Sequence, residues 1–250
     1  MAAVTHDIVD GVGRLVLSRA EQSNSFDLPA ARDMALAVQA VSADEVRAIT
    51  LTAEGKRFCA GGDVTSFLAS DDPSAYLLEL ASTLEGALRA LADLAKPVVA
   101  GVRGAVAGAG LGVMLTADVV VASRSTKFVM AYPGIGLTPD CGVSYLVPRA
   151  IGQQRALDFA LTGRVLSAAE ALDWGLVSYV VDDEDVERTV EQMARTWADS
   201  APSALGQARR LIRSSWETSG PEQGADESDT IAAAVRGDEA QRLVADFIRR

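Results

Sequence analysis

The hydrophobic and polar positions of this chain alternate between strand-like and helix-like segments. Thr5–Val9 and Gly13–Ser18 are predicted strands, and the Asp10-Gly11 pair between them is typical of a tight hairpin. Leu28–Val41 carries apolar residues at helical spacing, with Asp27 as the expected N-cap. The pattern continues with predicted strands at 46–52, 97–101, 118–122 and 176–181 and predicted helices at 73–94 and 109–116.

This alternation predicts an α/β fold with parallel strands and right-handed crossovers. From Asp185 onward the pattern is almost entirely helical, with helices expected at 184–200, 202–218 and 221–248. The last of these is expected to break near Gly237. The sequence therefore predicts an α/β body followed by a separate helical C-terminal region.

Composition and charge argue against some classes of function. The 250 residues are 49% hydrophobic and 23% charged, which is typical of a packed globular protein. The net charge of −11, without a basic stripe, argues against nucleic-acid binding. No apolar run is long enough to span a membrane, and the N-terminus lacks a leader-like apolar segment, so we expect no membrane association and a cytoplasmic location.

The chain is poor in histidine and cysteine. His6 is the single histidine, and Cys59 and Cys141 are far apart in the sequence. A structural zinc site and a Ser-His-Asp triad are therefore not expected, and no metal site is predicted. Without a histidine to activate a thiol, both cysteines are interpreted as packing residues. Proton transfer is left to carboxylates, Tyr, Lys, Cys or water.

Three glycine-rich segments could carry chemistry, and the first is Phe58–Val64. Gly61-Gly62 follows a predicted strand and allows close approach of a ligand to the backbone. Asp63 is placed to cap a short helix, which would gather N–H groups around a negative centre. An ordinary strand-to-helix turn is the alternative.

The second segment is Gly104–Gly112, which opens an apolar helix. Its glycine spacing differs from that of a dinucleotide-binding fingerprint, and it lacks the Gly-Lys-Ser/Thr ending of a phosphate loop. What remains is a helix start with free N–H groups, which is suited in principle to an anion or oxyanion. Close helix packing through small residues is the alternative.

The third segment, Ala131–Gly142, contains the isolated acid Asp140. Between Asp93 and Asp158 the only other acidic residue is Asp118, to which we assign a structural role. A carboxylate in apolar surroundings is suited to accept a proton. The alternative for Asp140 is a turn, or the N-cap of a helix from Ser144. Three cations could meet phosphate groups, although most such charges are simply solvated: Lys56, Arg57 and Arg103.

In this order and separation, the three segments resemble the crotonase (enoyl-CoA hydratase/isomerase) superfamily. The resemblance extends from about Val9 to the C-terminus and includes the Leu17–Ser25, Leu161–Arg164 and Trp174–Val177 segments. It implies a crotonase-like spiral of ββα repeats over residues 1–195. It also implies a C-terminal helical trimerisation region over 196–250, giving a homotrimer or a dimer of trimers.

The resemblance also implies an active site for acyl-CoA thioesters, with no separate cofactor. Its two oxyanion donors are the backbone N–H groups of Gly62 and Ala109. Phe247 and Arg250 are expected to reach a neighbouring subunit's ligand. The residues expected to contact the substrate or its coenzyme A portion are Ser23, Ala60, Gly62, Asp63, Val64, Gly108, Ala109 and Tyr132.

The choice of reaction depends on the carboxylates. In the superfamily, hydration uses two glutamates, at positions where this chain has Gly112 and, nearby, Tyr132. The Thr138–Gly142 loop instead resembles that of the isomerases, including the phenylacetate-pathway epoxide isomerase, and implies that Asp140 shuttles a proton from C2 to C4. Two alternatives stay open. One is hydration, hydrolysis or a ring-opening lyase step with Asp140 or Tyr132 in another role, and the other is a catalytically silent acyl-CoA binder.

Overall fold

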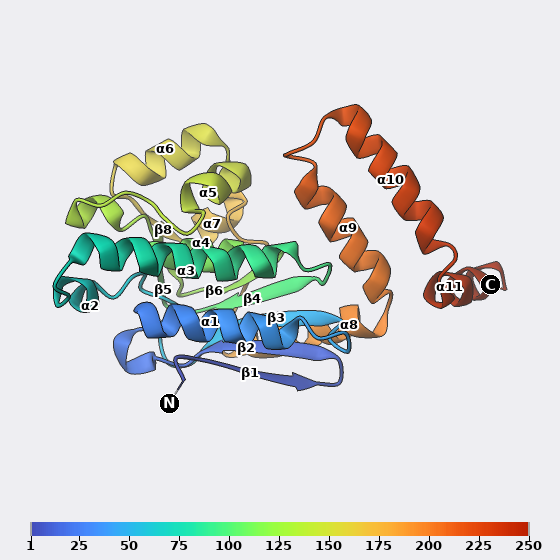
Figure 1. The fold of residues 1–250 in the computed structure, drawn as a ribbon, viewed down its shortest axis with the longest axis horizontal. Coiled ribbons are helices and arrows are strands. Elements are labelled where there is room, and N and C mark those ends of the chain that lie inside the picture. The colour runs from blue at the N-terminus through green and yellow to red at the C-terminus, as the bar shows by residue number, and fades with distance from the viewer. Residues whose placement is uncertain (1, 250) are drawn as a thin grey trace.

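A computed structural model describes residues 2–249, which form two sheets surrounded by helices (Figure 1). The larger sheet has the strand order β1-β2-β3-β4-β6-β9. Its strands are β1 (Val4–Val9), β2 (Val12–Leu17), β3 (Ala48–Ala53), β4 (Val98–Val102), β6 (Val119–Ser123) and β9 (Tyr179–Val181). Within this sheet, only β1 and β2 pair antiparallel, through the turn at Asp10 and Gly11, where φ is positive at both residues. The other pairs are parallel, so the predicted hairpin and α/β class are confirmed.

Helices cover both faces of the larger sheet. α1 (Leu28–Val41) and α3 (Pro73–Asp93) lie side by side over one face (Figure 1). α8 (Val186–Asp199) packs on the other face, where its Val186 and Val190 join Val99 of β4 in a second apolar cluster. The neighbouring Val98 belongs to the first cluster. Alternate residues of one strand therefore enter opposite cores, which explains why the parallel strands are apolar throughout.

A ββα unit recurs along the chain. The smaller sheet has the order β5-β7-β8 and consists of β5 (Ala105–Ala107), β7 (Lys127–Val129) and β8 (Val165–Ser167). In successive units the chain passes from β4 to β5 to α4 (Ala109–Leu115), and from β6 to β7 to α5 (Val143–Ile151). The first strand of each unit joins the larger sheet and the second joins the smaller sheet. The expected spiral is therefore confirmed.

The remaining helices of this part of the chain are short. α2 (Val64–Leu68) packs against α3, α6 (Gln153–Leu161) packs against α5, and α7 (Ala168–Trp174) packs against β8 and β9. Within the described residues, 3-10 turns cover Ala20–Gln22, Tyr132–Ile135 and Asp183–Asp185. No helix within residues 2–249 combines the length and apolarity needed to cross a bilayer.

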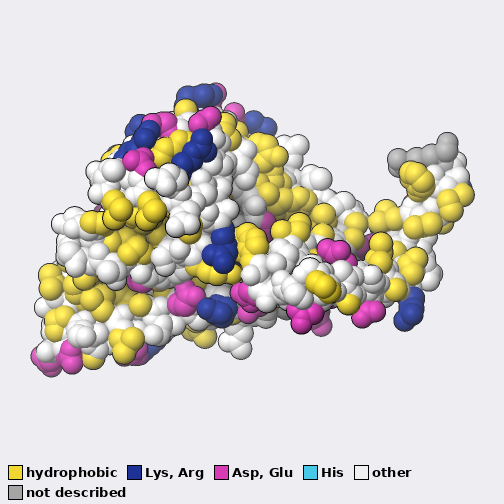
Figure 2. All heavy atoms as spheres, turned by 90° about the horizontal axis from the view of Figure 1, so that it is seen from above, with side chains coloured by type: hydrophobic (Ala, Val, Ile, Leu, Met, Phe, Trp, Pro, Cys, Tyr) yellow, Lys and Arg dark blue, Asp and Glu magenta, His cyan; other side chains and the backbone are white. Residues whose placement is uncertain are grey.

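The C-terminal helices leave the body of the protein. α9 (Pro202–Ser214) lies beside it, whereas α10 (Gly220–Ala234) and α11 (Asp238–Ile248) form an arm that points away (Figures 1 and 2). The break expected near Gly237 is confirmed, because Gly237 is the N-cap of α11. The predicted boundary between 195 and 196 falls inside α8, and the trimerisation role stays a prediction. Phe247 is 79% exposed on the arm, and Arg250 lies outside the described residues.

Asp118 links α9 to the α/β part of the protein, which agrees with the structural role assigned to it. One carboxylate oxygen accepts from Val98 N at 2.8 Å and from Arg209 Nε at 2.6 Å, and the other accepts from Arg213 Nε at 3.0 Å. The guanidinium group of Arg209 also donates to backbone carbonyls at the end of α3, among them Ala92 O at 2.6 Å. The ion pair therefore also satisfies carbonyl groups that the end of a helix leaves unpaired.

Candidate active site

The Gly61-Gly62 turn lies against the start of α4. Gly61 has φ +100°, and a Cβ built on it would lie 3.1 Å from Ala107 O and 3.6 Å from Ala109 N. Gly108, the N-cap of α4, has φ +53°, and its own Cβ would lie 3.7 Å from Gly61 Cα. Glycine at both positions lets the two backbones approach this closely. The first two sequence segments are thus brought together.

The amides of Gly62 and Ala109 donate to no atom within residues 2–249. Amides beside them do have acceptors, since Asp63 N donates to Phe26 O at 2.8 Å and Gly108 N donates to Val129 O at 3.2 Å. Two free N–H groups therefore occur in adjacent loops, one of them at a helix start. Such groups are suited to stabilise a negatively charged oxygen.

Asp63 holds the turn in place. Its carboxylate caps α2 by accepting from Ser66 N at 3.3 Å, as predicted, and pairs with Arg19 at 3.2 Å. Arg19 also pairs with Asp27, the N-cap of α1, at 3.0 Å. The carboxylate is therefore engaged in fixing the loop, and Val64 follows it at the exposed start of α2.

Ser23 and Ala60, both expected to contact the substrate, lie next to each other. Ala60 N donates to Ser23 O at 3.0 Å, and Arg57 Nη1 donates to Ser23 Oγ at 2.9 Å. Ser23 adopts a left-handed conformation with φ 54°. Of the cations singled out in the sequence, Arg57 thus lies at this turn, whereas Arg103 pairs with Glu187.

Asp140 accepts a hydrogen bond from a buried phenol. The O–H of Tyr132 donates to Asp140 Oδ1 at 2.7 Å, and Tyr132 is only 8% exposed. The Cζ atom of its ring lies 3.9 Å from the position of a Cβ on Gly108. Burial, followed by the charge of Asp140, raises the pKa of Tyr132, so the phenol keeps its proton and remains a donor. The third segment therefore meets the other two at the start of α4.

The alternative role of Asp140 as a helix cap is wrong. α5 begins at Val143, its N-cap is Gly142, and no side chain caps it. Asp140 takes part in this turn only through its backbone, whose carbonyl accepts from Val143 N at 3.0 Å. The carboxylate is therefore available to Tyr132 and to a ligand.

Gly112 has no room for a side chain. A Cβ built on it would lie 2.1 Å from Cys141 O and 3.1 Å from Cys141 C. Real Cβ atoms essentially never approach another heavy atom this closely, and the obstacle is backbone rather than a flexible side chain. The turn that presents Asp140 therefore occupies the space of a side chain at position 112.

Both cysteines are buried and free. Burial raises the pKa of Cys59 to about 12, and burial together with the nearby Asp140 charge raises the pKa of Cys141. Neither thiol is ionised near neutral pH, which agrees with a packing role. Within residues 2–249, no group of three or more His, Cys, Asp or Glu side chains is arranged to hold a metal ion.

Comparison with known proteins gives the family. The sequence profile for enoyl-CoA hydratase/isomerase matches residues 7–249. The chain is 39% identical over 219 residues to the 1,2-epoxyphenylacetyl-CoA isomerase of Escherichia coli K12, covering 86% of this chain and 83% of that protein. It is 35% identical over 194 residues to the trans-2-decenoyl-[acyl-carrier-protein] isomerase of Streptococcus mutans, covering 76% and 73%.

A solved structure agrees with these matches. The crystal structure of an enoyl-CoA hydratase/isomerase from Mycobacterium abscessus aligns with a TM-score of 0.93 at 31% identity, covering 99% of this chain and 96% of that one. The fold and its converging loops define an enzyme of the crotonase superfamily. Within it, the chain belongs to the enoyl-CoA hydratase/isomerase family, for which binding of an acyl-CoA substrate is the common property.

Proposed function

We propose that this protein is an enoyl-CoA isomerase in which Asp140 moves the proton. The observation that carries the proposal is the hydrogen bond of 2.7 Å from Tyr132 O–H to Asp140, formed beside the two free amides at the start of α4. One Asp140 oxygen is held by the phenol, which leaves the other for substrate. A single carboxylate in this place is suited to take up a proton and return it a few ångströms away.

The proposed reaction is balanced without any further reactant. Asp140 removes a proton from C2 of a 3-enoyl-CoA, and the electron pair left behind enters the conjugated thioester to form a dienolate. The same carboxyl group then delivers the proton to C4, and the double bond comes to lie between C2 and C3. Asp140 ends ionised, as it began.

The amides of Gly62 and Ala109 stabilise the intermediate in this proposal. Negative charge appears on the thioester oxygen only after the C2 proton has left, so donors aimed at that oxygen favour the transition state over the bound substrate. Loss of one such donor in other enzymes costs about 3 kcal/mol of transition-state stabilisation. Two donors would therefore supply a large part of the barrier reduction.

The environment of Gly112 supports isomerisation over hydration. The family resemblance implies that hydratases carry a glutamate at this position, and here the backbone of Cys141 fills the space. At the other hydratase position, near Tyr132, the chain has a phenol that keeps its proton. A water molecule held between two carboxylates therefore has no counterpart in these residues.

A substrate panel tests the proposal. Purified protein is incubated with 3-enoyl-, 2-enoyl- and ring-containing CoA thioesters, and products are identified by mass spectrometry and absorbance. We expect migration of the double bond. A 3-hydroxyacyl product or free coenzyme A would instead indicate hydration or hydrolysis, and binding without turnover would indicate a silent acyl-CoA binder.

Asp140→Asn is the matching variant, with Asp173→Asn as its control because the Asp173 side chain is 77% exposed in a loose ion pair. We expect Asp140→Asn to lose turnover while still binding a saturated acyl-CoA with a Kd close to that of the unaltered protein. Unchanged turnover would remove Asp140 from the mechanism.

A further inference from the structure

Cys59 lies between the two segments that carry the free amides. Its side chain is completely buried, and its sulfur accepts a hydrogen bond from Gly61 N at 3.4 Å. Sulfur is a weak acceptor, yet within residues 2–249 it is the only one that Gly61 N has. This hydrogen bond is made inside the turn, directly before the free amide of Gly62. The sulfur therefore helps to hold the backbone that presents this amide.

The backbone of Cys59 pairs with β5, the strand that leads into α4. Cys59 N donates to Ala105 O at 3.2 Å, and Ala107 N donates to Cys59 O at 2.9 Å. These bonds form a parallel bridge between Cys59 and Val106. β5 ends just before Ala109, the first residue of α4 and the carrier of the second free amide. The bridge therefore joins the two chain segments from which the amides project.

Gly110, the second residue of α4, lets Cys59 approach the helix closely. A Cβ built on Gly110 would lie 2.7 Å from Cys59 O, 2.9 Å from Cys59 Cβ and 3.1 Å from Cys59 Sγ. Gly110 directly follows Ala109, so this contact lies beside the second amide. Cys59 thus touches both segments, one through its sulfur and the other through its backbone and Cβ.

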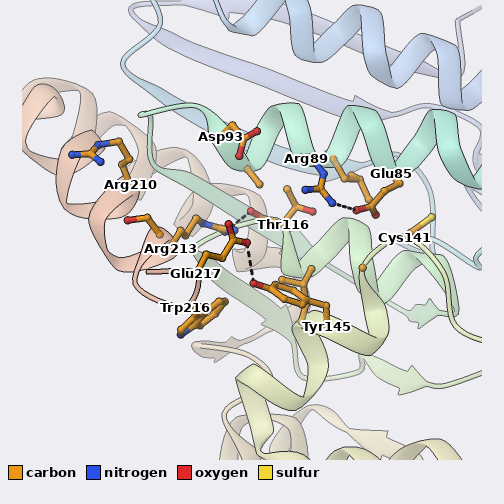
Figure 3. Close-up of a pocket in the computed structure, with 15 residues that line it drawn as sticks. Glu85, Arg89, Asp93, Thr116, Cys141, Tyr145, Arg210, Arg213, Trp216 and Glu217 are labelled. Atoms are coloured by element: carbon orange, nitrogen blue, oxygen red, sulfur yellow. Dashed lines mark hydrogen bonds and ion pairs between the residues drawn. The ribbon is translucent and has the colours of Figure 1, made fainter. Parts of the chain in front are cut away.

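The contacts of α4 with Cys59 and with Cys141 lie on opposite sides of the helix. With 3.6 residues per turn, Gly110 and Gly112 point about 200° apart around its axis. Cys141 lines the pocket between α3, α5 and α9 that Figure 3 shows, whereas Cys59 does not. α4 is therefore packed between two turns, and the Cys59 contact concerns the amides whereas the Cys141 contact concerns Asp140.

We propose that Cys59 is a positioning residue that fixes the distance between the amides of Gly62 and Ala109. The inference rests on the proposed function, in which both amides donate to the thioester oxygen. Two donors stabilise one oxygen only when both are held within about 0.5 Å of the productive geometry. A thiol suits this place, since it combines an acceptor for Gly61 N with a side chain small enough to lie against Gly110.

Two substitutions of Cys59 test this role by kinetics. Cys59→Ala removes the acceptor of Gly61 N, and Cys59→Ser keeps one at nearly the same place. Loss of a whole oxyanion donor typically lowers kcat about 100- to 1,000-fold, so displacement of one should lower it about tenfold. We expect this decrease in Cys59→Ala and a smaller one in Cys59→Ser, with a Kd for butyryl-CoA close to that of the unaltered protein in both.

Val190→Ala is the matched control, because it truncates a buried side chain of α8 in the second apolar cluster, away from the amides. It should lose stability and keep its kcat. A kcat of Cys59→Ala equal to that of Val190→Ala would overturn the proposal.

The carbonyl frequency of a bound thioester separates this inference from the isomerase proposal. Butyryl-CoA cannot be isomerised, and hydrogen bonds to its thioester oxygen lower the carbonyl stretching frequency, which infrared spectroscopy measures with an isotope label at that carbon. We expect a lowered frequency in the unaltered protein and in Val190→Ala, and a smaller lowering in Cys59→Ala. An equal lowering in all three would overturn the positioning role and leave the isomerase proposal in place. No lowering in the unaltered protein would remove the paired donors, and the role of Cys59 with them.

Discussion

The backbone carbonyl of Cys141 lies where a side chain at Gly112 would begin, 2.1 Å from an ideal Cβ. The turn that carries Asp140 and the middle of α4 thus share one packed contact. A carboxylate at position 112 and the observed place of Asp140 exclude each other without movement of the backbone. In the proposed mechanism, this contact links the glycine at position 112 to isomerisation rather than hydration.

Gly112→Ala is expected to destabilise the protein and to impair isomerisation, because the added methyl must displace the turn next to Asp140. Overpacking of a tight interior typically costs about 1–3 kcal/mol, and this site has backbone as its obstacle. Denaturant unfolding and steady-state kinetics measure the two effects. Gly134→Ala serves as the control, since a Cβ at Gly134 meets nothing within 4 Å. Equal stability of the two variants would contradict the packing described here.

Gly112→Glu is expected to add no hydratase activity. A new glutamate cannot occupy its place beside an unmoved Cys141, so 3-hydroxyacyl-CoA should stay absent from the products of 2-enoyl-CoA. Product analysis by mass spectrometry measures this. Appearance of the hydrated product would show that the turn at Cys141 can move to make room for the glutamate.

Tyr132→Phe is expected to lower kcat about 10- to 100-fold with little change in KM, because it removes a hydrogen bond to a charged group and keeps the ring. Tyr179→Phe, at a half-exposed position on β9, is the control. A kcat equal to that of the unaltered protein would contradict a role for this hydrogen bond in turnover.

Most features that depend on local sequence patterns, such as helix bounds and glycine-rich turns, were predicted from the sequence. The apolar spacing and Asp27 located α1 at its observed bounds, and Gly237 marked the break between the last two helices. The glycine-rich segments that meet at α4 were recognisable because close backbone approach requires residues without a side chain. Asp140 was recognisable because few other acids lie near it in the sequence.

Other features depend on contacts between distant segments. β5 has three residues of small or moderate size, too few to show an alternating pattern, and it was read as part of the helix start. Tyr132 was expected to contact the ligand, and its hydrogen bond to Asp140 depends on how the 3-10 turn folds the loop. The helix cap was assigned to Asp140 as an alternative because the left-handed Gly142 was not recognised as the N-cap.

Arg209→Ala is expected to destabilise the protein by about 3 kcal/mol, because it breaks a buried ion pair and leaves carbonyls at the end of α3 without their donor. Its guanidinium-bearing side chain is 4% exposed, whereas that of Arg188, the control, is 68% exposed. Denaturant unfolding of the two alanine variants measures the difference. A decrease in the free energy of unfolding below about 1 kcal/mol would mean that the Arg209–Asp118 pair contributes no more than an ordinary surface ion pair.

The thiols are expected to resist modification while the protein is folded. With a pKa of about 12, Cys59 stays protonated up to strongly alkaline pH, and only the thiolate reacts. A disulfide reagent should therefore modify neither cysteine between pH 7 and 9, and both after unfolding in guanidinium. Rapid reaction of the native protein, followed by absorbance, would contradict the burial of these side chains.

The most direct test of the central claim follows one hydrogen atom. A 3-enoyl-CoA deuterated at C2 is converted by the protein, and the product is analysed early in the reaction by mass spectrometry and NMR. Because one carboxyl group both removes and returns the proton, deuterium should appear at C4 of the 2-enoyl product and should be absent after incubation with Asp140→Asn. A product whose C4 hydrogen comes entirely from solvent, or one that carries a new hydroxyl group, would contradict the account.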